Sequence, residues 1–317
     1  MISKSIFLIV SLVLFSGCAF SNFKQEVKSQ FKTIKKDIKT SITVNDKKSD
    51  LTSSSRQNVG TIVSLSSDIF SQKNVKQGFY GPYGDSNHIP FGLFFLNQYD
   101  PNKKIVLFVH GISGSPTQFS YLINNLDKDK YQVLLAFYPS GFKLQKLGKY
   151  LDSLLVQLQD KLHFKKISIV AHSMGGLVSK SIINNQIKSA NLMVDSFISI
   201  STPWGGHKAA NFGVKYTPIV IPVWTDMAQG SDFLKDIYQV ELPMNFRHYL
   251  VFGFKGKSLT ADGNSDGVIS INSQLRLIVQ DKASIVKGYN ENHTSILKNK
   301  NMSNFVNKIL DENNKIN

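Results

Sequence analysis

Residues 169–176 read Ile-Val-Ala-His-Ser-Met-Gly-Gly and connect an apolar run to a stretch with helical spacing. The apolar run, residues 167–171, predicts a strand that is buried on both faces. The residues that follow, 175–185, predict a helix. Small residues on both sides of Ser173 allow the chain to turn sharply and to leave this side chain at the tip of the turn. The stretch therefore predicts a strand, a tight turn that carries a serine, and a helix.

The same alternation of strands and helices continues on both sides of this stretch. Apolar runs predict buried strands at residues 104–109, 132–137, 167–171, 197–200, 248–252 and 283–286. Apolar residues at helical spacing predict helices at residues 116–126, 144–162, 175–185 and 305–310. The fold class is therefore α/β, with a mostly parallel central sheet that helices cover on both faces. In such sheets, functional residues lie beyond the carboxyl ends of the strands.

Residues 171–176 resemble the nucleophile elbow of the α/β-hydrolases, whose pattern is Gly-x-Ser-x-Gly. Ala171 stands in place of the first glycine, and it is small enough for the turn. The resemblance implies an α/β-hydrolase fold with Ser173 as the nucleophile. It also implies that the backbone N–H of Met174, the residue after the nucleophile, contributes to an oxyanion hole.

A second segment supplies the other expected oxyanion donor. Residues 109–114 read Val-His-Gly-Ile-Ser-Gly and resemble the His-Gly-x signature of bacterial lipases. That resemblance assigns the second backbone N–H to Ile112. It implies no catalytic base at His110, because the family places its base near the carboxyl terminus, and we expect His110 to make a structural hydrogen bond.

The expected base and acid follow Ser173 in the chain order of this fold, acid first and histidine last. His293 follows the last expected strand, and the pair Asn292-His293 resembles the lipase pattern. Residues 263–269, Gly-Asn-Ser-Asp-Gly-Val-Ile, resemble the Asp-Gly-x-Val segment that carries the lipase acid, which is here Asp266. The other histidines that follow the serine are His207 and His248, and the alternative acids are Asp262, in first reserve, Asp195 and Asp226.

The surroundings of Asp266 also match the start of a calcium-binding loop. Asp262, Asn264, Asp266 and Gly267 follow the pattern Asp-x-Asn-x-Asp-Gly. The last ligand position, however, holds Ser273 in place of a glutamate, and the sequence predicts no flanking helices. We therefore expect no metal, and the resemblance implies no cofactor.

Two further segments, residues 137–141 and 201–206, extend the resemblance over residues 105–293. Together they resemble the lipase-like α/β-hydrolases, which include triacylglycerol lipases and a deacylase of glycolipid anchors. This implies hydrolysis of carboxylic esters through an acyl-enzyme, with a lipid or small ester as substrate. A thioesterase, amidase or acyltransferase with the same residues is an alternative, and so is a non-catalytic surface lipoprotein with this fold.

Residues 205–243 interrupt the alternation of strands and helices and are rich in apolar side chains. An apolar insertion at the active-site end of the sheet indicates a cap, or lid, over an acyl pocket. Ordinary packing of a helical excursion against the sheet explains the same pattern.

The amino terminus has the features of a lipoprotein signal peptide at residues 1–18. A basic start precedes an apolar stretch that is too short to span a bilayer. Residues 14–18, Leu-Phe-Ser-Gly-Cys, resemble a bacterial lipobox, although Phe15 replaces a small aliphatic residue; this implies lipidation of Cys18. Cys18 is the only cysteine, which excludes an internal disulfide and a CxxC zinc site. The alternatives are an ordinary cleaved signal, giving a periplasmic or secreted protein, and a retained anchor.

Residues 19–57 are expected to form a basic amphipathic segment and a linker. Apolar residues recur at helical spacing between lysines, so segment 23–42 can lie on an anionic membrane. A coiled coil or a core helix has the same spacing. The catalytic domain is then expected to span residues 58–317. The formal net charge of +15 comes mostly from lysine and lacks the arginine–aromatic pattern of nucleic-acid readers, so we expect no nucleic-acid partner.

Overall fold

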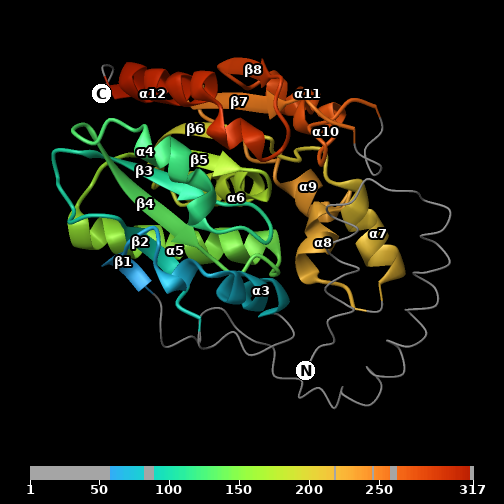
Figure 1. Ribbon diagram of the computed structural model, residues 1–317, viewed down its shortest axis with the longest axis horizontal. Coiled ribbons are helices and arrows are strands. Elements are labelled where there is room, and N and C mark those ends of the chain that lie inside the picture. The colour runs from blue at the N-terminus through green and yellow to red at the C-terminus, as the bar shows by residue number, and fades with distance from the viewer. Residues whose placement is uncertain (1–57, 82–88, 218, 245, 258–262, 315–317) are drawn as a thin grey trace, which may run out of the picture.

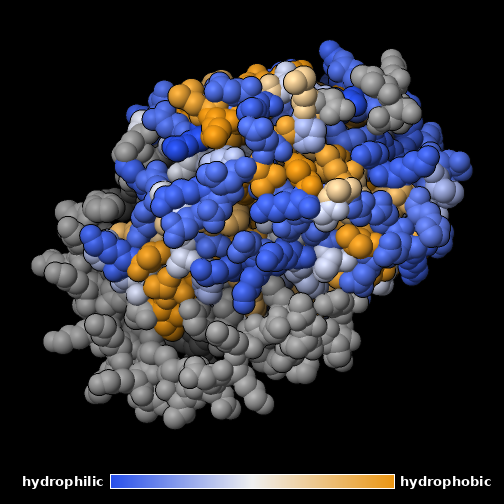
Figure 2. Space-filling model, turned by 180° about the vertical axis from the view of Figure 1, so that it is seen from behind, coloured by the Kyte–Doolittle hydropathy of each residue, from blue (hydrophilic) through white to orange (hydrophobic). Residues whose placement is uncertain are grey.

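The computed structural model describes residues 58–81, 89–217, 219–244, 246–257 and 263–314. The predicted signal peptide, Cys18, segment 23–42 and the reserve acid Asp262 lie outside these residues. Within the described part of the chain, no helix is long and apolar enough to cross a membrane. The surface in Figure 2 is mostly hydrophilic, with apolar side chains in separate small groups, as is common for globular proteins.

An eight-stranded sheet forms the centre of the molecule, in the order β1-β2-β4-β3-β5-β6-β7-β8. The strands are β1 (Asn58–Ile62), β2 (Gly92–Phe95), β3 (Lys104–Val109), β4 (Tyr131–Phe137), β5 (Ile167–His172), β6 (Val194–Ile200), β7 (Arg247–Gly253) and β8 (Ile285–Tyr289). All neighbouring strands are parallel except β2 and β4, which are antiparallel. The predicted mostly parallel sheet is thus confirmed.

Helices cover both faces of the sheet (Figure 1). The helical elements are η1 (Asp68–Phe70), α3 (Gln72–Tyr80), η3 (Pro116–Phe119), α4 (Ser120–Asn124), α5 (Leu144–Leu162), α6 (Met174–Lys188), α7 (Lys208–Tyr216), α8 (Pro222–Met227), α9 (Asp232–Asp236), α10 (Ile271–Gln274), α11 (Leu277–Gln280), η4 (Ser295–Lys298) and α12 (Lys300–Asn314). On one face, α5 and α6 pack their buried leucine and isoleucine side chains into the first core cluster. On the other face, η3, α4 and α12 pack into the second.

Local sequence explains most of these elements. In β3 the five residues from Ile105 to Val109 are all buried, which accounts for the continuous apolar run. The predicted helix at residues 144–162 coincides with α5, whose leucines repeat on its buried side. The predicted helix at residues 116–126 was too long, because the structure has the 3₁₀ turn η3 followed by the short α4.

The two ends of the sheet differ most from the prediction. Strands β1 and β2 were not predicted; they are short, and each contains a glycine with positive φ, Gly60 and Gly92. The last strand, predicted at residues 283–286, is β8 and begins at Ile285. Its residues are exposed except for Tyr289, because β8 is an edge strand, so its apolar pattern is weak.

Residues 205–243 fold into α7, α8 and α9, with connecting segments. In Figure 1 these helices lie together beyond the side of the sheet toward which the arrow of β5 points. This is the edge at which the carboxyl ends of the parallel strands meet. The excursion therefore lies at the end of the sheet that carries Ser173.

Candidate active site

Ser173 lies in the sharp turn between β5 and α6, with φ 55° and ψ −131°. A positive φ is uncommon for a residue with a side chain, and it marks a strained turn. Helix α6 packs so closely against neighbouring segments that the two positions after Met174 have no room for a side chain. A Cβ at Gly175 would lie 2.3 Å from the carbonyl oxygen of Val109, and one at Gly176 would lie 2.0 Å from Thr202 Oγ1. The small residues thus let α6 begin directly behind the serine.

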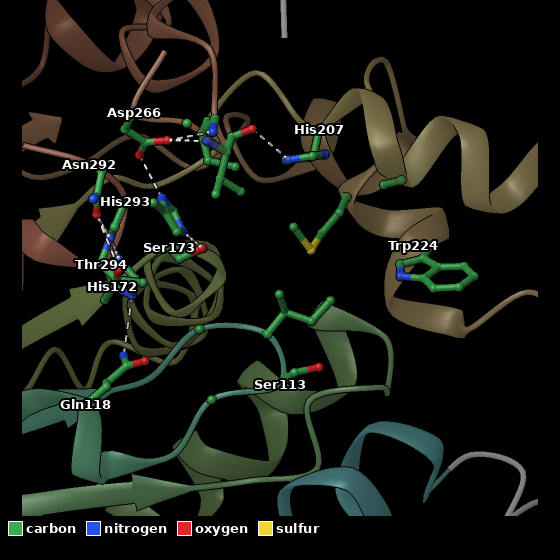
Figure 3. Close-up of a pocket in the computed structure, with 18 residues that line it drawn as sticks. Ser113, Gln118, His172, Ser173, His207, Trp224, Asp266, Asn292, His293 and Thr294 are labelled. Atoms are coloured by element: carbon green, nitrogen blue, oxygen red, sulfur yellow. Dashed lines mark hydrogen bonds and ion pairs between the residues drawn. The ribbon is translucent and has the colours of Figure 1, made fainter. Parts of the chain in front are cut away.

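Ser173, His293 and Asp266 form one hydrogen-bonded series (Figure 3). His293 Nε2 lies 3.0 Å from Ser173 Oγ, and His293 Nδ1 lies 2.6 Å from Asp266 Oδ2. The other carboxylate oxygen, Oδ1, accepts hydrogen bonds from the backbone N–H groups of Val268 (2.9 Å) and Ile269 (2.7 Å). Every carboxylate oxygen of Asp266 therefore has a partner, although the side chain is fully buried.

The charge of Asp266 determines which ring nitrogen of His293 carries the proton. Burial by itself raises the pKa of Asp266, but the opposing charge of His293, its hydrogen bond and the two backbone donors lower that pKa overall. Asp266 is then ionised at neutral pH and accepts a hydrogen bond from the protonated Nδ1 of His293. The Nε2 atom of His293 is left as an acceptor for the hydroxyl of Ser173. This arrangement can remove the hydroxyl proton and turn the serine into a nucleophile.

The two predicted backbone donors lie at the ends of segments that meet at Ser173. Met174 is the first residue of α6, where backbone N–H groups lack partners within the helix and the helix dipole is positive. Ile112 follows Gly111, and a Cβ at Gly111 would lie only 2.9 Å from the Cβ of Ser173. Within the described residues, the N–H groups of Ile112 and Met174 donate no hydrogen bond. Both are thus available to an anion at Ser173.

His110 makes a structural hydrogen bond, as expected from its place in the loop after β3. Its Nδ1 donates to the carbonyl oxygen of Gly111 at 2.8 Å. Its ring stacks on Tyr138 with 4.1 Å between centroids, and the Tyr138 hydroxyl donates to the backbone oxygen of His110. Burial lowers the pKa of His110 to about 4, so the ring is neutral at neutral pH.

The structure also brings two further histidines to the site, His172 and the alternative base His207, neither of which bonds Ser173. His172 Nε2 lies 2.7 Å from the backbone oxygen of His293, and its Nδ1 faces Gln118 Nε2 at 3.4 Å. His207 Nε2 lies 3.0 Å from the backbone oxygen of Val268, and its Nδ1 accepts the N–H of Ala209 at 2.9 Å. Each ring supports a loop that carries His293 or Asp266. For His172 the only sequence signal was a polar residue directly before Ser173, whereas His207 was considered as a base and takes a supporting place instead.

The remaining predicted alternatives lie elsewhere. His248 is buried and bonds Ser199 at 2.8 Å, and Asp195 pairs with Lys104 at 2.5 Å. Asp226 accepts the backbone N–H of Leu144 at 2.7 Å, at the start of α5. None of these three side chains contacts His293.

A cavity of about 450 Å³ opens beside Ser173. Its lining residues are Gly111, Ile112, Ser113, Gly114, Gln118, His172, Ser173, His207, Ala210, Trp224, Met227, Asp266, Gly267, Val268, Ile269, Asn292, His293 and Thr294. Among the described residues, no group of three or more His, Cys, Asp or Glu side chains could hold a metal ion. Ser173, Asp266 and His293 all lie on the wall of this cavity.

Comparison with known proteins connects this geometry to a family description. Residues 100–235 match the model of a family described as "Putative serine esterase (DUF676)". The matched residues include Ser173 and the loop after β3, but end before Asp266 and His293. A search of curated protein sequences finds no match to this chain.

Solved structures show the same fold at low sequence identity. The mature form of the Bacillus licheniformis lipase BlEst2 is 19% identical, with a TM-score of 0.53, over 69% of this chain and 97% of that one. A "putative esterase" from Staphylococcus aureus is 14% identical, with a TM-score of 0.53, over 94% of both chains. A gene product of Listeria innocua is 12% identical, with a TM-score of 0.51, over 66% and 94%. The predicted α/β-hydrolase fold is confirmed.

Proposed function

We propose that this protein is a serine hydrolase that cleaves carboxylic esters, with Ser173 as nucleophile and His293 as base. Asp266 is the acidic residue of the triad, whose carboxylate orients His293. The observation that carries the proposal is the hydrogen-bonded series from Asp266 through His293 to Ser173 at the wall of a cavity. The family match over residues 100–235, which is described as a serine esterase, supports hydrolase activity.

The first half of the reaction forms an acyl-enzyme. His293 Nε2 takes the hydroxyl proton of Ser173 while Oγ attacks the carbonyl carbon of the ester. The negative charge that develops on the carbonyl oxygen accepts hydrogen bonds from the N–H groups of Ile112 and Met174. His293 then gives its proton to the leaving oxygen, the ester bond breaks, and an alcohol departs.

The second half releases the acid and restores the enzyme. His293 takes a proton from water, and the hydroxide attacks the acyl carbon. Collapse of the second tetrahedral intermediate breaks the bond to Oγ, and the proton on His293 returns to Ser173. Asp266 stays ionised throughout and stabilises the protonated ring of His293.

Hydrolysis of p-nitrophenyl butyrate tests this proposal. We expect turnover by the wild type and none above background by Ser173→Ala, with Ser179→Ala, a serine inside α6, as the matched control. A fluorophosphonate should label the wild type at Ser173 alone. No turnover of any ester together with no labelling would reject the enzyme in favour of a non-catalytic lipoprotein.

The same nucleophile serves other acyl transfers, so the leaving group must be tested separately. A butyryl thioester, a butyryl anilide and p-nitrophenyl butyrate share one acyl group and differ only in the bond that breaks. We expect the ester to have the highest kcat/KM. A higher kcat/KM for the thioester would favour a thioesterase, and a higher value for the anilide would favour an amidase. Transfer of the butyryl group to an added alcohol in place of water would favour an acyltransferase.

The amino-terminal sequence supports a location at the cell envelope, anchored by lipidation of Cys18 with help from the basic segment 23–42. The protein then reaches lipid or small ester substrates from a membrane surface. A globomycin-sensitive precursor that labels with palmitate, and loses the label in Cys18→Ser, is the expected result. An unmodified amino terminus downstream of Cys18 would indicate a periplasmic or secreted protein.

A further inference from the structure

The cavity beside Ser173 has two sides of different chemistry. Gln118, Asn292 and Thr294 lie together on one side of the serine, whereas Trp224 lies on the opposite side (Figure 3). Trp224 shares its side with Ala210 of α7 and Met227 of α8. His207 and Ser113 also lie toward the Trp224 side (Figure 3), but both ring nitrogens of His207 are already bonded to the backbone. An ester bound at Ser173 would therefore find polar partners for its alcohol on one side and mainly apolar side chains for its acyl group on the other.

Helix α8, which carries Trp224, is attached to the rest of the protein on three sides. The N–H of Val223 donates to the backbone oxygen of Gly141 at 3.1 Å. The buried carboxylate of Asp226 accepts the N–H of Leu144 at 2.7 Å, at the amino end of the nineteen-residue α5. The backbone oxygen of Met227 accepts the N–H of His207 at 2.8 Å. These bonds make α8 a fixed wall of the cavity.

No space for an extending chain lies behind Trp224. Its side chain is only 6% exposed, and its ring lies 6.2 Å from that of Phe79 in α3. On α7, a Cβ at Gly213 would lie 2.7 Å from the indole ring, so the helix backbone itself touches the ring. Only the absence of a side chain at Gly213 allows this packing.

The indole N–H of Trp224 is directed toward the cavity. In Figure 3 its nitrogen is on the edge of the ring that faces Ser173, and within the described residues it has no hydrogen-bond partner. An alkyl chain that reached this edge would displace water from a polar donor and offer no acceptor in return, which is unfavourable. The polar edge of Trp224 and the close packing behind its ring thus both limit the length of acyl chain that this side of the cavity can hold.

We propose that Trp224 ends the acyl side of the cavity and restricts the enzyme to esters of short acyl groups. This inference rests on the proposed function of Ser173. A cavity of about 450 Å³ agrees with it, because it is near the lower end of the range of roughly 300–1,000 Å³ found for ligand sites. Trp224 is a specificity-determining residue in this view, and it takes no part in bond cleavage.

The test is a profile of acyl lengths with one leaving group, the p-nitrophenyl esters of acetate, butyrate, octanoate and dodecanoate, each below its solubility limit. For the wild type, kcat/KM should fall at least about tenfold from butyrate to dodecanoate. For Trp224→Ala, the ratio of dodecanoate to butyrate should rise at least about tenfold. Ratios within one variant are unaffected by a loss of correctly folded enzyme, and fluorophosphonate titration gives the active fraction.

A second variant moves the limit in the opposite direction. Ala210→Leu extends a side chain into the cavity from α7, so the ratio of butyrate to acetate should fall at least about tenfold. Phe212→Ala is the matched control, because Phe212 belongs to the same helix but does not line the cavity. Its profile should match that of the wild type.

Three results would overturn the inference. A wild-type profile that is flat or rises toward dodecanoate would do so while leaving the proposed function intact. Profiles of Trp224→Ala and Ala210→Leu that both parallel the wild type would show that the acyl group lies elsewhere. Absence of turnover on all four esters, with Ser173 unlabelled, would reject the proposed function and this inference together.

Discussion

Replacing Asp266 with asparagine changes one atom at the centre of the proposed catalytic site. In the wild type, the N–H groups of Val268 and Ile269 bond Asp266 Oδ1 at 2.9 and 2.7 Å. The amide oxygen of an asparagine can still accept both hydrogen bonds. The amide nitrogen then faces His293 Nδ1, where the carboxylate oxygen lies at 2.6 Å. Because an NH₂ group only donates, Nδ1 must give up its proton and become an acceptor.

That exchange of partners places the ring proton on the wrong nitrogen. His293 Nε2 would carry the proton and could no longer accept one from Ser173, 3.0 Å away. We expect kcat to fall about 10⁴-fold, the size of effect that loss of the productive tautomer causes in a serine protease. At about 1.36 kcal/mol per factor of ten, this equals roughly 5.4 kcal/mol of transition-state stabilisation. KM should change little, because Asp266 acts through His293.

The assay is steady-state hydrolysis of p-nitrophenyl butyrate, corrected for active enzyme, with two matched variants. Asp226→Asn removes the charge of another buried acid at this end of the sheet, and its amide oxygen can still accept the N–H of Leu144. Asp262→Asn removes the acid held in reserve. Both should keep kcat close to the wild-type value. The reasoning is refuted if Asp266→Asn retains kcat within about tenfold, or if Asp262→Asn suffers the larger loss.

Four further predictions follow from the same structure. Burial lowers the pKa of His110 and His207 to about 4 and that of His172 and His248 to about 3. Because the unfolded residues titrate near 6.5 and bind protons first, the free energy of unfolding should fall as the pH drops from about 6.5 to about 4, by up to about 1.4 kcal/mol per pH unit for each histidine. Urea unfolding across this range checks the slope, which His248→Gln should reduce, and a flat profile contradicts it. Gly111→Ala should lower kcat at least about tenfold, because its Cβ would lie 2.9 Å from that of Ser173; unchanged kcat in a folded variant would argue against that contact. EDTA and added Ca²⁺ should alter neither kcat nor the melting temperature, because both carboxylate oxygens of Asp266 already have partners; a calcium-dependent melting temperature would favour the calcium loop. Finally, the rate should rise hyperbolically through the solubility limit of tributyrin, because α8 is held as a fixed wall; a jump at that limit would indicate a lid that opens at interfaces.

The fold was predictable where its signal is local. Strands β3 to β7 are buried along most of their length, so each contains a run of mostly apolar residues that stands out from the helices around it. Strands β1 and β2 lie at the other end of the sheet and are only five and four residues long. The antiparallel pairing of β2 with β4 joins residues about forty positions apart, and no local pattern specifies it.

The candidate site was predictable through chain order and resemblance, and its surroundings were not. Ser173, Asp266 and His293 each follow a strand, so the parallel sheet brings them to one edge and the structure places them in hydrogen-bond contact. Their catalytic roles stay predictions until variants are measured. The bond from Asp226 to Leu144 spans 82 positions. A sequence pattern read over one helix or strand cannot reveal such a contact, which is why the fixed wall was not predicted.

The neutral histidines around Ser173 connect the stability of the fold to the proposed chemistry. His207 Nδ1 accepts the N–H of Ala209 at the start of α7, and its Nε2 donates to the backbone oxygen of Val268, beside Asp266. A protonated ring has no acceptor, so protonation would break the bond to Ala209 and remove the cap at the start of α7, beside the loop that carries the acid. His172, which also bonds the backbone of His293, is held neutral by burial and by the charge of His293. Acid should therefore disrupt the loops of the site together with the fold, and activity should fall in parallel with stability below pH of about 6.5.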